Sequence, residues 1–398
     1  MKRTGNALLI KEINRNIILN HIRDNNPVSR AEIATECGLN RSTVSSLVDG
    51  LIEEGMVFET GTGESRGGRK PILLEFNPLA ATIIGMELGV NYVVFLLSYL
   101  NARIIKKKVL KISPSMGFEA IVDSMGNVLD NLIKEAPSTP GGFAGIGIGV
   151  AGLVDYRSGN ITFAPNLEWR NAPLGTLFSE RYNCTVFMDN EANAGAMGEM
   201  MFGKSHKEED IIYLSINEGL GAGIIMDRKV FRGCGGYAGE VGHTTLVGDG
   251  PRCSCGNNGC WEMFTSETAL KGFAAGVGLE INKIIAEGSG NNCFTDTLSL
   301  MAHRGDISAR RVFEKAGEYL GLGLANLINT LNPSNIVIGG KLSGGFKWMQ
   351  GTMQEVVEKR VLSELLSGIK IVPSSLGKEA CATGGIGMVL QGILHEPL

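Results

Sequence analysis

The sequence has no long apolar run, and no stretch approaches the roughly 20 apolar residues that a membrane-spanning helix needs. Its N-terminus carries charged residues around a short apolar segment, so we expect no secretory signal peptide. It also has no cysteine framework that would form disulfides. Five of its eight cysteines are scattered along the chain (Cys37, Cys184, Cys234, Cys293 and Cys381). Scattered cysteines are typical of reduced thiols in a cytosol, so we expect a cytoplasmic protein with no membrane partner.

A strong excess of one charge is also missing. The formal net charge is −4 and the sequence pI is about 5.9, so the whole chain shows no basicity that would indicate nucleic-acid binding. A small DNA-binding module could still be averaged out in this total. At 398 residues, with 43% hydrophobic residues and 55 glycines, the chain is long enough for two or three globular domains.

Cysteine is concentrated in one segment, residues 239–262, which reads GEVGHTTLVGDGPRCSCGNNGCWE. It places His243 ten residues before Cys253, and Cys255 and Cys260 follow. Three thiolates and one imidazole complete a tetrahedral zinc shell with no open position, which predicts a structural Zn²⁺ site. The two glycines between the last two cysteines allow the tight turn that such a site needs. The alternative is an incidental run of buried thiols, which the close spacing and the upstream histidine disfavour.

Two carboxylates, Glu240 and Glu262, bracket this segment. A metal that fixes the loop would also fix these two acceptors. We interpret them as candidates to bind the hydroxyl groups of a small polar ligand.

Residues 1–77 are predicted to form a winged helix-turn-helix domain. Isoleucines at helical spacing between residues 10 and 22 indicate a first helix, and Ser29-Arg30-Ala31-Glu32 is a capping box for a second. Asn40 can cap a third helix, whose buried side is expected to carry Val44, Leu47, Val48 and Leu51. Its open side carries the candidate DNA contacts Arg41, Ser42, Thr43, Ser45 and Ser46, whose types suit base edges and phosphates.

A β-hairpin is expected next, with a basic tip that would act as a wing. Arg66, Arg69 and Lys70 lie at or near this tip and can contact phosphate or the minor groove. The alternative is a three-helix protein–protein module, since acidic and basic residues are equally numerous. The basic residues gather where a winged helix would present them, which favours DNA. One module reads few bases, so we expect a homodimer or higher homo-oligomer on a palindromic operator.

From about residue 80 onward the pattern changes to alternating strands and helices, which predicts α/β layers with ligands at the carboxyl ends of strands. The glycines of the buried strand expected at 142–155 should allow close backbone approach to a ligand. Polar residues follow the strands, and we propose them as ligand contacts: Asn166, Asn190, Glu191, Glu240 and His243. Together they suit a polyhydroxylated ligand. Taken singly, each is better explained as a helix cap or loop residue, so the prediction depends on the group.

Two motifs carry a family resemblance. The run INEGLGAGIIMDRKVFRGCGGYAGEVGH, followed by CSCGNNGCWE, resembles the ROK family of repressors, open reading frames and sugar kinases. The winged helix in front resembles its repressor branch, and DNEANAGAMGE resembles the xylose repressors within that branch. The resemblance implies an actin-like, hexokinase-type (ribonuclease H-like) fold, with a small lobe at 80–189 plus 378–398 and a large lobe at 190–377. It also implies sugar contacts at Asn166, Asn190, Glu191, Glu240, His243 and Glu262, and zinc on His243, Cys253, Cys255 and Cys260.

The sequence departs from the kinases of the family at the phosphate site. Those kinases open with Asp-x-Gly-Gly-Thr, whereas this chain has Glu87-Leu88-Gly89-Val90-Asn91, which removes a glycine and a hydroxyl donor. The kinase base is an aspartate, and Glu191 stands at its position, one methylene longer. Lys341 follows Gly339-Gly340 where kinases often keep a third glycine. We therefore expect no catalytic residue.

The sequence thus predicts a sugar-responsive transcriptional repressor of a carbohydrate-utilisation operon, released from operator DNA by a monosaccharide inducer. The resemblance implies xylose as the favoured sugar and glucose as the next, because no sequence motif distinguishes a pentose from a hexose. The alternative is an ATP-dependent sugar kinase of the ROK type with a fused DNA-binding domain. Release by docking a transport protein is known in the family, and no residue pattern here supports or excludes it.

Overall fold

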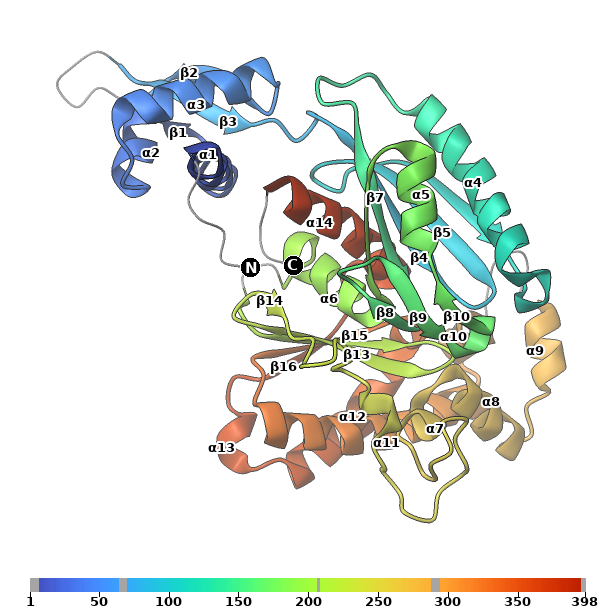
Figure 1. Ribbon diagram of the computed structural model, residues 1–398. Helices are drawn as coiled ribbons and strands as arrows, with labels where there is room; N and C mark the ends of the chain where they lie inside the picture. Colours follow the sequence, from blue (N-terminus) through green and yellow to red (C-terminus); the bar gives the residue numbers. More distant parts are fainter. Residues whose placement is uncertain (1–6, 64–69, 206–207, 288–293, 395–398) are drawn as a thin grey trace.

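The computed structural model describes residues 7–63, 70–205, 208–287 and 294–394, and it shows a small N-terminal module beside a larger two-lobed body (Figure 1). Within these ranges, no helix combines the length and the apolar character that crossing a bilayer requires.

The N-terminal module is a winged helix, as the sequence predicts. Ser29 begins α2 with the expected capping box, and the Asn40 side chain accepts a hydrogen bond from the Thr43 N–H at 2.8 Å to begin α3. The expected buried stripe of α3 is confirmed. A two-residue strand that the sequence did not indicate, β1, completes a three-stranded sheet in the order β1-β3-β2. The elements are α1 (Ala7–Asp24), β1 (Val28–Ser29), α2 (Arg30–Glu36), α3 (Arg41–Glu53), β2 (Val57–Thr62) and β3 (Ile72–Phe76).

The two lobes of the body are built on sheets with the same strand order. The first sheet runs β11-β7-β4-β5-β6 and the second runs β14-β13-β12-β15-β16. In each, three consecutive strands form an antiparallel meander, and two later strands add in parallel beside the first. This repeated order is the one expected for the actin-like, hexokinase-type fold.

The first sheet consists of β4 (Thr82–Leu88), β5 (Tyr92–Tyr99), β6 (Ile104–Lys111), β7 (Phe143–Val150) and β11 (Thr185–Asn190). The second consists of β12 (Ile211–Ile216), β13 (Leu220–Met226), β14 (Lys229–Val230), β15 (Asn335–Gly339) and β16 (Lys370–Pro373). Further helices of the body are α4 (Gly117–Glu135), α5 (Leu174–Tyr182), α8 (Glu267–Gly276), α9 (Ile281–Glu287), α10 (Phe294–His303), α11 (Ile307–Leu331), α12 (Phe346–Arg360) and α13 (Ser363–Leu366).

Two helices, α6 (Glu191–Phe202) and α14 (Ala380–Leu394), pack against each other between the two sheets (Figure 1). Glycines make this packing close. A Cβ on Gly147 of β7 would lie 1.9 Å from the carbonyl oxygen of Gly385, and one on Gly384 would lie 1.7 Å from that of Ala194. The expectation that the glycines of β7 approach a ligand was therefore wrong, because at Gly147 they admit a helix backbone instead.

The single strand expected at 142–155 was also wrong, because it breaks at Ala151-Gly152 into β7 and β8 (Leu153–Asp155). With β9 (Asn160–Ala164) and β10 (Trp169–Ala172), β8 forms a separate three-stranded sheet. The break depends on a close contact with β9: a Cβ on Gly152 would lie 2.7 Å from the carbonyl oxygen of Phe163, so the chain can turn there only without a side chain.

Candidate functional site

The predicted DNA-reading side of α3 is open. Arg41, Ser42 and Ser46 are exposed, and Thr43 and Ser45 are half-buried. Lys70 is exposed at the start of the return strand, whereas Arg66 and Arg69 lie outside the described residues. Arg30, at the start of α2, is held by Asp49 at 2.8 Å and Glu59 at 3.3 Å. Its charge is therefore already compensated, and Arg41 is the arginine of α3 that is available to a phosphate or base.

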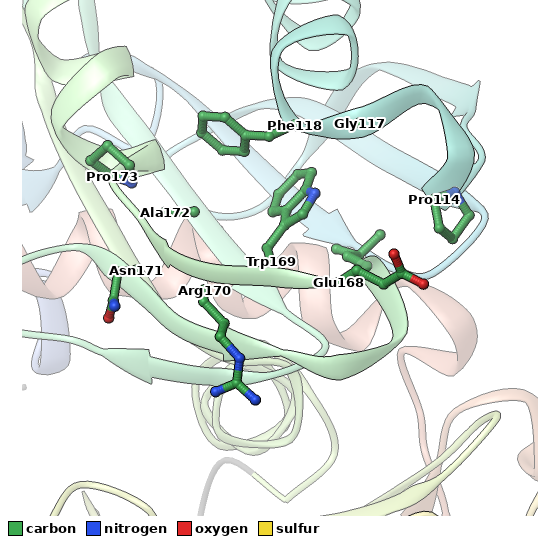
Figure 2. Close-up of a pocket in the computed structure, with 10 residues that line it drawn as sticks. Pro114, Gly117, Phe118, Glu168, Trp169, Arg170, Asn171, Ala172 and Pro173 are labelled. Atoms are coloured by element: carbon green, nitrogen blue, oxygen red, sulfur yellow. The ribbon is translucent and has the colours of Figure 1, made fainter.

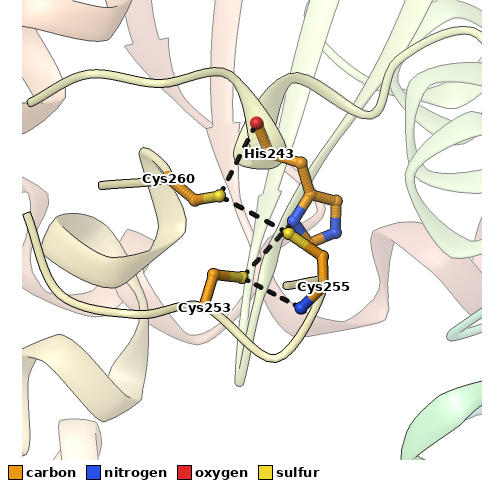
Figure 3. A group of neighbouring side chains, drawn as sticks. All are labelled: His243, Cys253, Cys255 and Cys260. Carbon is orange, nitrogen blue, oxygen red and sulfur yellow. Dashed lines mark hydrogen bonds between the residues drawn. The ribbon is translucent and has the colours of Figure 1, made fainter. Parts of the chain in front are cut away.

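The four predicted zinc ligands lie together (Figure 3). Their ligand atoms are all within 4.8 Å of one another. Cys255 Sγ lies 3.6 Å from Cys260 Sγ, and Cys253 Sγ lies 3.7 Å from His243 Nδ1. A tetrahedral zinc ion with Zn–S bonds of about 2.3 Å spaces its ligand atoms roughly 3.5 to 3.8 Å apart. The donor set and its spacing therefore fit zinc.

The loop that carries the thiols is shaped by its glycines, as expected. Gly256 and Gly259 have φ of +97° and +68°, which favours glycine. A Cβ on Gly259 would also lie 1.6 Å from the carbonyl oxygen of Val247. Backbone hydrogen bonds from Cys253 N to Asn257 O and from Gly256 N to Cys253 O close the turn, at 2.8 and 3.0 Å.

His243 connects the thiol cluster to the two carboxylates. It lies in the short helix η3 (Val241–His243), directly after Glu240. Its Nδ1 faces the thiols and lies 3.5 Å from Glu262 Oε1, while its Nε2 lies 3.8 Å from Glu240 Oε2. Glu262 begins α7 (Glu262–Thr265), and its Oε1 accepts a hydrogen bond from Cys253 Sγ at 3.0 Å. One ring nitrogen is thus placed for a metal, and the other faces a candidate sugar-binding carboxylate.

Asn190 and Glu191 lie where β11 passes into α6. The side chain of Asn190 caps α6, because its oxygen accepts the Ala192 N–H at 2.8 Å. Its amide group donates to Gly152 O and to Glu191 Oε2, both at 3.0 Å. The helix-cap explanation therefore applies to Asn190, and the same side chain also orients the Glu191 carboxylate.

Asn166 comes from a different element, the turn between β9 and β10. It is exposed in the short helix η2 (Pro165–Leu167). Among the described residues, no hydrogen bond or ion pair joins its side chain to the other predicted sugar contacts.

The structure also contains a buried ion pair next to Asn190, between Arg232 and Asp189, which the sequence pattern did not predict. Arg232 Nη2 donates to Asp189 Oδ2 at 2.7 Å, and both side chains are buried. Asp189 Oδ1 accepts from the Asn190 N–H at 2.8 Å. The Arg232 guanidinium also lies over the Tyr156 ring, 4.3 Å from its centroid. The pair ties the loop after β14 to the end of β11, 43 residues away, so sequence spacing gave no sign of it.

The hairpin between β4 and β5, which binds phosphate in the family kinases, is filled by a side chain. The Tyr92 hydroxyl donates to Glu87 Oε1 at 2.6 Å. A Cβ on Gly89 would lie 2.7 Å from the Tyr92 ring, so the ring covers the one glycine that the hairpin retains.

On the opposite lobe, Lys341 forms ion pairs with Glu218 and Glu267. Its backbone N–H also donates to the Asn217 side chain at 2.9 Å. Glu218 lies in the turn of the glycine-rich strand pair, and its negative charge raises the pKa of Glu87. A carboxylate here would repel phosphate. The sequence analysis assigned no role to Tyr92 or Glu218. Glu218 could have been singled out, because it lies in the family-like run INEGLGAG.

We call the region around Glu87, Glu191, Glu240, His243 and Glu262 the cleft. The carboxyl groups of Glu87, Glu191 and Glu240 influence the pKa values of one another or of their neighbours. Burial raises the pKa of Glu191 to about 8, and the charges of Glu240 and Glu87 add to this effect. Burial raises the pKa of Glu87 to about 7, opposed by the hydrogen bond from Tyr92. Partial desolvation also raises the pKa of Glu240, whose side chain stays partly exposed.

These raised pKa values predict that the sugar-free protein loses stability as pH rises. Between about pH 4.3, the ordinary glutamate pKa, and about pH 7, Glu87 is protonated when folded and ionised when unfolded. The free energy of unfolding should therefore fall over this window, by on the order of 3 kcal/mol from Glu87.

Urea unfolding at a series of pH values tests this prediction. Glu87→Gln should give a flatter dependence between pH 5 and 7 than wild type. The exposed Glu119, changed to Gln, is the control and should leave the slope unchanged. A slope that Glu87→Gln does not alter would contradict the prediction.

The chain is similar to known proteins along nearly its whole length. The ROK family model matches residues 83–391, and the MarR family model matches residues 17–67. The chain is 40% identical to the "Xylose repressor" of Caldicellulosiruptor bescii, over 99% of each chain.

Two solved structures are also similar. A ROK family transcriptional regulator, described as a homologue of the Escherichia coli MLC protein, matches with a TM-score of 0.80 and 26% identity, over 97% of this chain and 98% of the other. A ROK family glucokinase from Streptomyces griseus, in complex with glucose and AMPPNP, matches with a TM-score of 0.68 and 30% identity, over 78% of this chain and 100% of the other. This chain therefore belongs to the ROK family and carries a MarR-type winged helix at its N-terminal side.

Proposed function

We propose that this protein is a sugar-responsive transcriptional repressor of a carbohydrate-utilisation operon. One observation carries the proposal: a single chain joins an exposed DNA-reading helix to a cleft in which Glu191, Glu240, Glu262 and His243 gather. Carboxylates and an imidazole are suited to the hydroxyl groups of a monosaccharide. The inducer releases operator DNA by binding the released arrangement more tightly, and a coupling of about 1 to 3 kcal/mol is typical.

D-Xylose is the proposed inducer, with glucose as the next candidate. The support is the full-length similarity to a protein named xylose repressor. Pentose and hexose differ by one hydroxymethyl group. The contacts proposed for the sugar are Asn166, Asn190, Glu191, Glu240, His243 and Glu262.

The His243–cysteine cluster is proposed to hold one structural zinc ion, because four protein ligands leave no open position. Operator binding is proposed to require a homodimer or higher homo-oligomer. The reason is that one winged helix contacts too few base pairs for specific binding.

Phosphate transfer is not part of the proposal. The Tyr92 ring over Gly89, the carboxylate of Glu218 and the ion-paired Lys341 support this choice. In a kinase these positions have to admit and stabilise the phosphates of ATP.

Thermal unfolding of the purified protein against a panel of sugars, each with and without ATP and Mg²⁺, tests the proposal. D-Xylose alone should raise the unfolding temperature, since a ligand at 100 times its Kd stabilises by about 2.7 kcal/mol. The same sugar should release the protein from DNA. A temperature shift that needs nucleotide, or the appearance of sugar phosphate, would instead establish a kinase.

A further inference from the structure

The loop of residues 231–239 joins the second sheet to the candidate sugar site. It follows β14 and leads directly into Glu240. The loop is braced at both ends, because the Ala238 N–H donates to Arg232 O at 3.0 Å and Gly239 O accepts a backbone hydrogen bond from β13 at 2.8 Å. A force on Arg232 is therefore passed through a short, fixed stretch of backbone to the segment that carries Glu240.

The side chain of Arg232 reaches from this loop to the first sheet. Its Nε and Nη2 both donate to Asp189 Oδ2, at 3.1 and 2.7 Å. Asp189 lies in β11, and Asn190 and Glu191 follow it directly. The guanidinium also lies 4.3 Å from the centroid of the Tyr156 ring, in the turn between β8 and β9. One side chain of the second-sheet loop thus contacts two elements on the other side of the candidate sugar site.

Asp189 connects Arg232 to the start of α6. Its Oδ1 accepts from the Asn190 N–H and from the Asn193 side chain of α6, both at 2.8 Å, while its Oδ2 is bound by Arg232. The side chains of Arg232 and Asp189 are only 7% and 3% exposed. They are therefore too buried to serve as sugar contacts themselves, and they act through the backbone segments that they fix.

A buried ion pair supplies geometry more reliably than stability. The cost of removing both charges from water offsets much of their attraction, so the pair adds little net stability. Separating the partners is costly, however, because each charge would then be left buried without compensation. The pair therefore holds the loop and β11 at one separation.

We propose that Arg232 is a positioning residue of the candidate sugar site. Through Asp189 it fixes the segment of Glu240 and His243 against the start of α6, where Glu191 lies, so that acceptors from both sides converge on one ligand. Without the pair the acceptors remain, but binding a sugar must also order the loop, which lowers the affinity. This role rests on the function proposed above, because that function supplies the ligand.

The first test needs no sugar. Spin labels are attached through a noncanonical amino acid at Glu119 of α4 and at Asp249, six residues after His243, which are both exposed. Thiol labels are avoided because three cysteines belong to the candidate metal cluster. Double electron–electron resonance then measures the distribution of distances between the segment after His243 and the elements beside the first sheet.

Two variants of the full chain are compared with wild type. Asp189→Asn combined with Arg232→Met removes both charges, so no charge is left buried alone and the chain should fold. Its distance distribution should be broader than that of wild type and have a longer mean. Arg232→Lys keeps the charge but replaces the planar guanidinium by a compact ammonium, so its distribution should lie between the two.

Isothermal titration calorimetry with D-xylose measures the consequence for binding. The double variant should raise the Kd by about tenfold, since ordering the loop then accompanies binding. Arg232→Lys should recover part of this loss. The unfolding temperature of each variant, measured in parallel, separates a change in the site from a change in overall stability.

Two other arginines are matched controls. Arg181 also pairs with an aspartate at 2.7 Å, but this pair with Asp130 joins α5 to α4 on one side of the site only. Arg170 also lies over an aromatic ring, 3.9 Å from the centroid of Phe163, and Figure 2 shows its guanidinium extending away from the Trp169 ring. Arg181→Met and Arg170→Met should leave both the distance distribution and the Kd unchanged.

A wild-type distance distribution in the folded double variant would overturn the proposal, and so would a wild-type Kd. A lower unfolding temperature with distances and Kd unchanged would assign the pair to stability alone. Wild-type protein that gives no heat with D-xylose would refute xylose as the inducer. The distance distributions, which are measured without sugar, would still decide whether Arg232 positions the segment of Glu240.

Discussion

Replacing Cys255 by serine is expected to release the zinc ion and to weaken the sugar response. Serine is a poor zinc ligand, and a structural site with three ligands lacks its closed tetrahedral shell. We expect the affinity for zinc to fall by roughly 100-fold or more, because one of the four ligands is lost. The stability of the fold should fall with it, since the free energy of zinc binding also contributes to folding. The loop would then no longer hold His243, whose Nε2 faces Glu240.

Zinc content by elemental analysis and the unfolding temperature measure this effect. Wild type should carry one zinc ion per chain and lose stability with a chelator. Cys234→Ser is the matched control, because Cys234 is exposed in the loop before Glu240 and belongs to no cluster. Retention of one zinc ion per chain by Cys255→Ser would contradict the assignment of the ligands.

Glu191→Ala is expected to abolish induction and leave operator binding intact. Its carboxyl group is oriented by Asn190 and lies near Glu240 in the cleft. Removing it leaves a sugar hydroxyl without its acceptor, which should weaken sugar binding by roughly 100-fold or more. The change is far from α3, so the DNA contacts should persist.

Fluorescence anisotropy on a DNA duplex that wild-type protein selects from a random pool separates the two activities. Glu191→Ala should bind this duplex as tightly as wild type and stay bound at D-xylose concentrations that release wild type. Arg41→Ala is the reciprocal variant: it should bind the duplex more weakly and be stabilised by sugar as wild type is. Equal loss of both activities in either variant would refute the division of roles between the winged helix and the cleft.

The N-terminal module was predictable because its rules are local. A capping box at Ser29 and Glu32, an Asn40 cap and an apolar stripe each depend on residues within one or two turns. The metal cluster was predictable for the same reason, since three of its four ligands lie within eight residues and glycines set the turn.

The β7 glycines show where local rules fail. Glycines in a strand signal close approach, but the approaching group at Gly147 is α14, which is more than 200 residues away in the sequence. The break at Gly152 likewise depends on Phe163, in a hairpin that the sequence pattern did not reveal.

The winged helix, the α/β body and the residues that could hold zinc were predictable from the sequence, because they follow from short-range periodicity, capping and ligand spacing. Which groups meet between the two lobes could be seen only in the folded chain. The Arg232–Asp189 pair and the Tyr92 ring over Gly89 depend on how separate elements pack. Burial, which raises the pKa of Glu87, is a property of that packing and not of any local sequence pattern.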